Sequence, residues 1–148
     1  MRVMKGDLLQ LALQNRFDAI VHGCNCFNTM KSGIAGQIVK MWPQAAEVDN
    51  ATNMGDQNKL GTYTLAETPC CIIVNGYTQY HYGMTFGPPF DYDAFAKLLE
   101  KLDYDFPKDT KWGFPLIGCG LAGGDEIKVL RMLREWAISR DVTVVRFD

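Results

Sequence analysis

A short polar loop near the N-terminus holds residue types that bind anions and sugars. It follows an apolar run at 19–21 and precedes a helix expected to begin at Ile34, and its polar or flexible residues include Asn25, Asn28, Ser32 and Gly33. The first N–H groups of a helix and the positive end of its dipole favour anions. Ligands of open α/β sheets bind beside the carboxyl ends of the strands. The stretch Asp18–Val39 therefore predicts a site for a nucleotide or a phosphorylated ligand.

A second loop, Gly118–Gly124, is rich in glycine and also lies between a predicted strand and a predicted helix. It lacks the Lys and Ser/Thr of a phosphate-binding P-loop, and no GxxxxGK[ST] motif occurs in the chain, which excludes a nucleoside-triphosphatase loop of that type. Glycine permits positive φ and close approach of the backbone to a ligand. The loop can therefore wrap a diphosphate with main-chain N–H donors alone.

Two titratable side chains flank these loops. His22 precedes the first loop and can act as a general acid, or it can hydrogen-bond a loop carbonyl from within the core. Asp125 follows the second loop and can act as a general base, as a metal-free electrostatic group or only as a helix cap. His81, in an aromatic loop, is expected at the surface. The residues alone leave these alternatives open.

The cysteines form neither a disulfide framework nor a convincing metal site. The chain has five, an odd number, and Cys24, Cys26 and Cys119 lie in or near the two loops. A Cys-x-Cys pair without further Cys or His at ligand spacing is a weak metal signal. We expect reduced thiols, no bound metal and no cofactor.

Strand and helix patterns alternate around the loops. Strands are expected at 2–4, 19–22, 62–66, 70–75, 112–117 and 142–147, with the third and fourth paired, and helices at 8–14, 34–41, 43–53, 91–102 and 125–139. Asp7 is a candidate N-cap of the first helix. The alternation predicts an α/β fold, a three-layer α/β/α sandwich with a mixed, mostly parallel central sheet. The two loops would then lie side by side at one edge of the sheet.

Length and composition indicate one ordinary globular domain, residues 1–148. The hydrophobic fraction is 47% and the charged fraction 22%, and no apolar run approaches the roughly 20 residues that span a bilayer. No secretory signal is evident, so we expect a cytoplasmic protein, and we expect a monomer. The net charge of −2 provides no basic field for non-specific nucleic-acid binding, which favours a small ligand.

Four motifs in the chain resemble those of macrodomains, the ADP-ribose-binding fold. They occur in family order over nearly the whole chain and comprise Gly6-Asp7-Leu8, Ile20-Val21-His22-Gly23-Cys24-Asn25, Ser32-Gly33-Ile34-Ala35 and Gly118-Cys119-Gly120-Leu121-Ala122-Gly123-Gly124. The resemblance implies ADP-ribose, or a derivative of it, as the ligand.

The resemblance also implies a role for each motif. Asp7, beside Leu8, would accept a hydrogen bond from the adenine amino group, and Phe147 would stack on the adenine. Asn25 would hold hydroxyls of the distal ribose. The backbone from Ser32 through Gly33 and Ile34 to Ala35 would line that ribose, and the diphosphate would be clasped by Gly118, Cys119, Gly120, Leu121, Ala122 and Gly123.

Within the family, the His-Gly-Cys-Asn sequence is most similar to the branch of yeast-type ADP-ribose 1''-phosphate phosphatases, in which a histidine at the position of His22 has been proposed as catalytic. Two residues depart from family patterns. Lys31 stands where glycine is usual, so it can either strain a loop that needs the freedom of glycine or supply a cation to a terminal phosphate. Ala122 stands where a glycohydrolase branch has an aspartate, which argues against the Lys/Asp covalent mechanism of that branch.

Three functions follow from this resemblance. The first is removal of the 1''-phosphate from ADP-ribose 1''-phosphate by water attack, assisted by His22 and Asp125. The second is removal of ADP-ribose from modified protein or nucleic acid. The third is a non-catalytic reader that binds ADP-ribose, free or attached to a macromolecule. All three would use one pocket, so the sequence does not choose among them.

Overall fold

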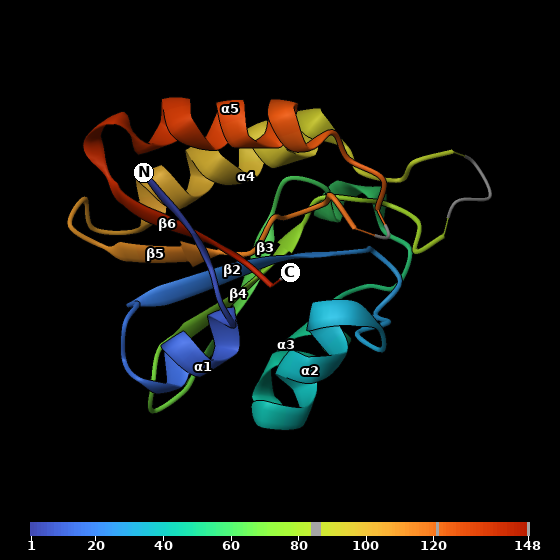
Figure 1. Cartoon of the computed structure of the whole chain (residues 1–148). Coiled ribbons are helices and arrows are strands. Elements are labelled where there is room, and N and C mark those ends of the chain that lie inside the picture. Colours follow the sequence, from blue (N-terminus) through green and yellow to red (C-terminus); the bar gives the residue numbers. More distant parts are fainter. Residues whose placement is uncertain (84–86, 121, 148) are drawn as a thin grey trace.

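A single mixed sheet forms the centre of the molecule (Figure 1). The structure, a computed structural model, describes residues 1–83, 87–120 and 122–147. In these ranges the sheet has the order β1-β6-β5-β2-β4-β3. Its strands are β1 (Arg2–Lys5), β2 (Ala19–Cys24), β3 (Tyr63–Glu67), β4 (Ile72–Tyr77), β5 (Lys111–Phe114) and β6 (Asp141–Arg146). Neighbouring strands are parallel except β3, which pairs antiparallel with β4.

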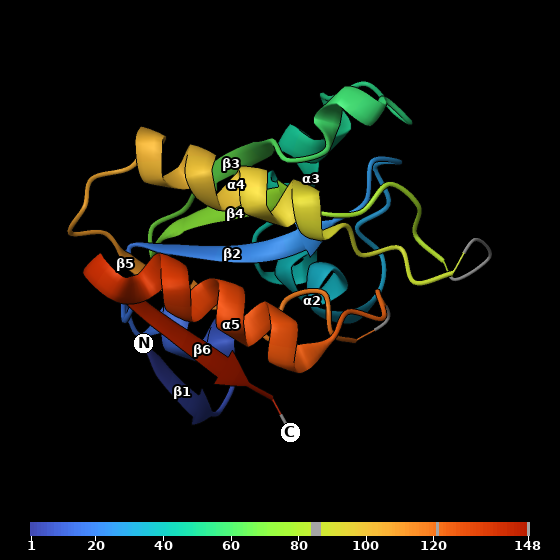
Figure 2. The same cartoon turned by 90° about the horizontal axis from the view of Figure 1, so that it is seen from above.

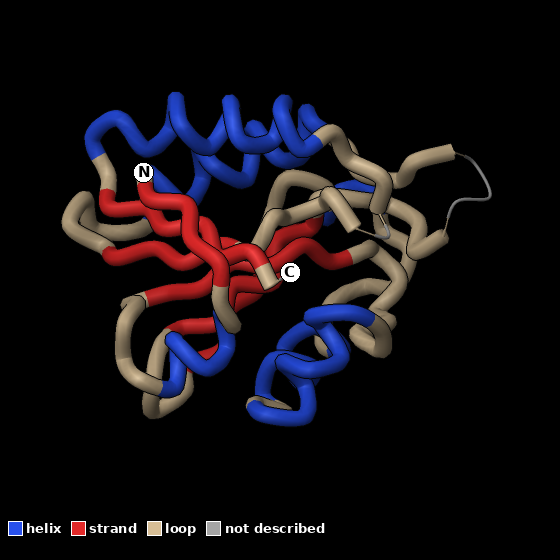
Figure 3. The backbone as a smooth tube through the Cα atoms, viewed as in Figure 1, coloured by secondary structure: helices blue, strands red, loops and turns tan. Residues whose placement is uncertain are grey.

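Helices cover both faces of this sheet (Figures 1 and 2). One face carries α4 (Tyr92–Asp105) and α5 (Glu126–Trp136), and the other carries α1 (Leu8–Leu13), α2 (Gly33–Met41) and α3 (Gln44–Asn50). The short 3₁₀ helices are η1 (Gln57–Lys59) and η2 (Ala137–Ser139). Figure 3 shows the resulting order of helix, strand and helix layers. The predicted three-layer α/β/α sandwich with a mixed, mostly parallel sheet is confirmed.

The pleat of β2 divides the core into two clusters. Ala19 and Val21 pack into the cluster under α4 and α5, whereas Ile20 packs into the cluster that faces α1, α2 and α3. All three side chains are completely buried. Successive residues of a strand point to opposite faces, so a strand covered on both sides reads as a continuous apolar run. The prediction that the run at 19–21 is a buried strand is confirmed.

Several element ends differ from those predicted. The helix expected at 43–53 is α3, which ends at Asn50. Just beyond it, Oγ1 of Thr52 donates to the Asp49 carbonyl at 2.6 Å, and Nδ2 of Asn28 donates to the Thr52 carbonyl at 3.1 Å. The strand expected at 112–117 ends at Phe114, because Pro115 has no N–H to donate to a neighbouring strand. The helix expected to end at Leu102 continues to Asp105.

The strand expected at 70–75 begins at Ile72. The Thr68 hydroxyl accepts hydrogen bonds from the N–H groups of Cys70 and Cys71, and this turn delays the strand. The predicted pairing of the third and fourth strands is confirmed, with Ala66 opposite Ile73. In the described ranges, no helix has the length and apolar character needed to cross a membrane.

The second glycine loop lies against an aromatic side chain. Gly118 has φ +75°, and a Cβ added there would fall 2.2 Å from the Phe90 ring. The N–H of Gly124 donates to the Gly118 carbonyl at 2.7 Å, which folds the loop back on itself. Glycine is therefore required at position 118 both by conformation and by space.

Candidate functional site

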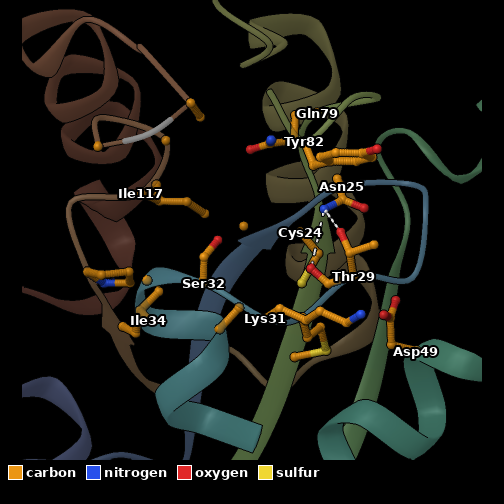
Figure 4. A pocket seen from close by; sticks show the side chains of 18 of the residues that line it. Cys24, Asn25, Thr29, Lys31, Ser32, Ile34, Asp49, Gln79, Tyr82 and Ile117 are labelled. Carbon is orange, nitrogen blue, oxygen red and sulfur yellow. Dashed lines mark hydrogen bonds between the residues drawn. The ribbon is translucent and has the colours of Figure 1, made fainter. Parts of the chain in front are cut away.

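Two adjoining cavities lie at the carboxyl ends of the central strands. The larger, of about 640 Å³, is bounded by the first, polar loop and the second, glycine-rich loop (Figure 4). Its wall comes from the end of β2, the first loop, the start of α2, α3, the loop after β4 and the loop after β5: Gly23, Cys24, Asn25, Thr29, Met30, Lys31, Ser32, Gly33, Ile34, Ala35, Asp49, Gln79, Tyr82, Pro115, Leu116, Ile117, Gly118, Gly120 and Ala122. The two loops thus meet at one edge of the sheet, as predicted.

The smaller cavity, of about 420 Å³, lies between α1, the start of α2 and the end of β6. Its wall is mostly apolar with one carboxylate, and consists of Asp7, Leu8, Leu9, Gly33, Ile34, Gln37, Pro115, Leu116, Cys119, Gly120, Val145 and Phe147. The cavities share Gly33, Ile34, Pro115, Leu116 and Gly120, so they adjoin along the start of α2 and the loop after β5. Together they could hold one elongated ligand.

The start of α2, where the cavities meet, is left without a side-chain cap. Ser32 is its N-cap residue and its hydroxyl makes no capping hydrogen bond. By contrast, Asp7, Asp91 and Asp125 cap α1, α4 and α5 through their carboxylates. The first N–H groups of a helix lack partners within it and favour an anion. The boundary between the cavities is therefore suited to a negatively charged group.

Asn25 holds the shape of the first loop. Its Oδ1 accepts from the N–H of Phe27 at 2.7 Å, and its Nδ2 donates to Oγ1 of Thr29 at 2.7 Å (Figure 4). Buried Lys59 supports the same loop by donating to the Cys26 carbonyl and to Oδ1 of Asn28. Nδ2 of Asn25 also donates to the Thr29 carbonyl at 3.5 Å, a long bond that a ligand hydroxyl in the larger cavity could replace.

His22 lies beneath the site, outside the walls of both cavities. It is completely buried, and its Nε2 lies 2.7 Å from Oδ1 of Asn75. Nδ2 of Asn75 donates to the Ala45 carbonyl, which orients the amide and makes Nε2 of His22 the donor. Burial lowers the pKa of His22 to about 4, against the opposing effect of the Asn75 hydrogen bond. The structure places His22 in the core, so any catalytic role for it would have to be indirect.

Asp125 also lies outside the walls of both cavities. Its Oδ1 accepts from the N–H groups of Ile127 and Lys128, and it is the N-cap of α5. Of the three roles open to it, the structure shows the helix cap. Gly123 likewise lies outside both walls, and Leu121 lies outside the described residues.

The other predicted ligand-binding residues are divided between the cavities. Asp7, Leu8, Cys119 and Phe147 line the smaller one, although Asp7 also caps α1 by accepting from the N–H of Leu9 at 3.0 Å. Phe147 is 77% exposed, so its ring is available for stacking. The larger cavity is lined by Asn25, Lys31, Ser32, Ala35, Gly118 and Ala122. Both cavities are lined by Gly33, Ile34 and Gly120.

Sequence reasoning missed several wall residues, notably Asp49, Gln79 and Tyr82. Asp49 is 1% exposed and accepts a hydrogen bond from the Tyr77 hydroxyl at 2.7 Å. Burial raises its pKa, while the Tyr77 hydrogen bond and the charge of Lys59 act in the opposite direction. No pattern in the helix that contains Asp49 sets it apart from a solvent-facing residue.

The sulfur and imidazole groups near the site do not assemble into a metal centre. Cys24 lines the larger cavity, and burial raises the pKa of its thiol well above the usual value. His81 stacks on Phe27 with ring centroids 5.6 Å apart and is not among the wall residues. Within residues 1–83, 87–120 and 122–147, no three His, Cys, Asp or Glu side chains are grouped as metal ligands.

Comparison with known proteins gave one sequence relative and a set of similar structures. No model of a known protein family matches the chain. An uncharacterised 17.5 kDa protein of Enterobacteria phage T4 is 32% identical over 156 residues, which cover 99% of this chain and 96% of that protein. A Bacteroides thetaiotaomicron protein of unknown function is similar in structure, with a TM-score of 0.79 and 24% identity over 99% and 97% of the two chains.

Two further similar structures carry functional names. The macrodomain of Mycobacterium tuberculosis DarG has a TM-score of 0.73 and 20% identity, over 97% of this chain and 96% of that one. Thermosipho africanus DarTG, whose structure is a complex with ADP-ribose, has a TM-score of 0.76 and 14% identity, over 99% of this chain and 42% of that one.

Proposed function

Because the chain belongs to the same family as the 17.5 kDa phage T4 protein and has the macrodomain fold, we propose that it binds ADP-ribose. The observation that carries the proposal is the pair of cavities that adjoin at the uncapped start of α2. ADP-ribose is a nucleoside and a second ribose joined by a diphosphate, so two cavities separated by an anion site match its three parts.

Each part of the ligand is assigned to a region of the site. Adenosine occupies the smaller cavity, where Asp7 accepts from the adenine amino group and Phe147 stacks on the ring. The diphosphate lies at the junction, against the backbone of Gly33 and Gly120. The terminal ribose occupies the larger cavity, near Asn25. The ADP-ribose complex of Thermosipho africanus DarTG, part of which has the same fold, supports the choice of ligand.

Gly120→Ala tests this arrangement with little disturbance of the fold. Gly120 belongs to both cavity walls and has no positive φ, and a Cβ added there would meet no atom of the described residues within 4 Å. The added methyl group should therefore leave the thermal midpoint unchanged but obstruct the diphosphate, weakening ADP-ribose binding about tenfold or more, or about 1.4 kcal/mol, in isothermal titration calorimetry.

Gly83→Ala is the matched control, because Gly83 also has no positive φ, has no atom of the described residues within 4 Å of its Cβ position, and lies outside both walls. It should bind ADP-ribose as the wild type does. The proposal is contradicted when the wild-type protein shows no heat of binding with ADP-ribose, or when Gly120→Ala and Gly83→Ala bind it equally well.

We propose further that the site hydrolyses ADP-ribose 1''-phosphate. The observation in favour is Lys31, whose cationic side chain belongs to the wall of the larger cavity and can pair with a terminal phosphate. Water would add to the phosphorus atom, the bond to the 1''-oxygen would break, and that oxygen would take a proton to leave free ADP-ribose and inorganic phosphate. The catalytic roles of His22 and Asp125 stay predictions.

Release of inorganic phosphate from ADP-ribose 1''-phosphate measures this activity. Lys31→Ala and Asn25→Ala should reduce it, and His22→Ala tests the predicted role of the histidine. Two other results would replace the phosphatase by an alternative. Release of free ADP-ribose from a modified protein or nucleic acid would identify a hydrolase of that linkage, and calorimetric binding with no product in either assay would identify a reader.

A further inference from the structure

Asp49 is a carboxylate that α3 brings to the wall of the larger cavity. Its side chain projects from α3 toward the cavity, on the side away from Ile34 and the start of α2 (Figure 4). The residue is 1% exposed, so it is nearly withdrawn from bulk water. A carboxylate in such surroundings needs hydrogen-bond donors to offset the loss of hydration.

The protein provides only part of that set of donors. The Tyr77 hydroxyl donates to Oδ1 of Asp49 at 2.7 Å, and within the described ranges no hydrogen bond reaches Oδ2. Lys59 is the nearby cation, but its Nζ donates to the Cys26 carbonyl and to Oδ1 of Asn28. Oδ2 of Asp49 therefore retains acceptor capacity beside the cavity.

Two side-chain oxygens of the first loop already accept a hydrogen bond each. Oδ1 of Asn25 accepts the N–H of Phe27, and the Thr29 hydroxyl oxygen accepts from Nδ2 of Asn25. A ligand hydroxyl that enters this end of the cavity needs an acceptor for its proton, and the carboxylate of Asp49 is the strongest one on the wall.

We propose that Asp49 accepts a hydrogen bond from a hydroxyl group of the terminal sugar and thereby sets the preference of the site for a sugar-ended nucleotide. The inference rests on the proposed function. It also orients the ligand, because a carboxylate repels phosphate whereas the start of α2 attracts it. The anionic part of the ligand is thus held at the junction and the neutral hydroxyls are held at Asp49.

Asp49→Asn tests the proposal, with ADP-ribose and ADP as the two probes. ADP lacks the terminal ribose and ends in a phosphate that Asp49 repels, so loss of the carboxylate should not weaken ADP binding. Asn preserves the size of the side chain and can still accept from Tyr77, but it loses the charge that strengthens a hydrogen bond from a hydroxyl. In calorimetry, Asp49→Asn should weaken ADP-ribose binding about 10- to 100-fold and should not weaken ADP binding, so that the variant no longer prefers ADP-ribose.

Asp105→Asn is the matched control, because Asp105 accepts from the Tyr63 hydroxyl at 2.8 Å and lies outside both cavity walls. It should keep the wild-type preference. ADP binding by Asp49→Asn also shows that the variant is folded. The comparison of ADP-ribose with ADP in the wild type needs no variant.

The outcomes separate this inference from the proposed function. When the wild type binds neither nucleotide, the proposed function fails and the role of Asp49 fails with it. When the wild type binds ADP-ribose but no better than ADP, or when Asp49→Asn keeps the full preference for ADP-ribose, ADP-ribose binding stands and only the role of Asp49 is overturned.

Discussion

The hydrogen bond from His22 to Asn75 makes the imidazole part of the framework that carries the site. It joins β2 to β4, and the same amide continues to the Ala45 carbonyl on α3. His22 is completely buried and its pKa is about 4, so the ring is neutral near pH 7. A neutral, buried imidazole is poorly suited to donate a proton to a ligand, but it can position the strand that delivers Cys24 and Asn25 to the cavity.

This burial predicts how stability depends on pH. The ordinary pKa of 6.5 applies to His22 in the unfolded chain and about 4 in the folded one, so the unfolded state binds more protons as the pH falls. The contribution of His22 to stability should be constant above pH 6.5 and should fall between about pH 6.5 and 4, by at most about 3 kcal/mol. Urea unfolding at several pH values measures this loss.

His22→Gln should remove most of that pH dependence, whatever its effect on stability at pH 7. The chain has two histidines, and His81→Gln is therefore the matched control that should keep the wild-type slope. A His22→Gln variant whose stability falls with pH as steeply as that of the wild type would refute the assignment of the slope to His22.

At this scale, residues fixed by local chemistry could be predicted and residues brought by packing could not. Ser32 and Gly33 line the cavities because a loop that leads from a parallel strand to a helix lies at the carboxyl end of that strand, where ligands bind. Asp49 gave no signal, because a polar residue in an amphipathic helix usually faces water. His22 was identified as chemically capable, but only the surrounding elements show that it faces the core.

Among the helices, α5 begins with a capped turn and α2 with an open one. The carboxylate of Asp125 accepts from two N–H groups at the start of α5. That arrangement leaves the side chain occupied by its own helix, in keeping with its place outside the cavity walls. The cap and the predicted role as general base can be separated, because asparagine caps a helix well but is not a base.

Asp125→Ala should destabilise the protein by about 1 kcal/mol, whereas Asp125→Asn should be nearly neutral, as judged by thermal unfolding. Asp91→Ala, at the start of α4, is the control and should cost a similar amount, because its carboxylate caps in the same way. If Asp125→Asn keeps the wild-type stability but abolishes phosphate release, the residue has a chemical role in addition to the cap.

The elements themselves could be predicted from periodicity, but their ends depend on contacts distant in the sequence. Thr68, Pro115 and Asp91 signal turns or caps through their own chemistry. Thr68 is enough to predict where β4 begins, and Pro115 is enough to predict where β5 ends. After the end of α3, the Thr52 carbonyl accepts from Asn28, a residue of another segment, so this contact has no signal in the local sequence.

For the whole molecule, alternation of strands and helices predicted the layers but not the order of the strands. The order β1-β6-β5-β2-β4-β3 places β2 in the interior and β1 at an edge. Both the first loop and the second follow interior strands, β2 and β5, which pair with each other. The loops that bound the cavities therefore follow strands that have a hydrogen-bonded neighbour on each side.

Amide hydrogen exchange should reflect this position. Residues 19–21 of β2 are completely buried between two helix layers, so their amides should exchange only through openings close in free energy to global unfolding. Val3 and Met4 on β1 are 39% and 38% exposed and should exchange sooner, through local opening. Equal protection of β1 and β2, measured by NMR under native conditions, would contradict this ranking.

The open start of α2 implies a compromise between folding and binding. A carboxylate at Ser32, like those that begin α1, α4 and α5, would stabilise α2 by about 1 kcal/mol. Under the proposed function, it would also place a negative charge where the diphosphate belongs. The free protein thus lacks a stabilising interaction at the start of α2, and ligand binding supplies it. Ser32→Asp should therefore raise the thermal stability of the free protein and weaken ligand binding.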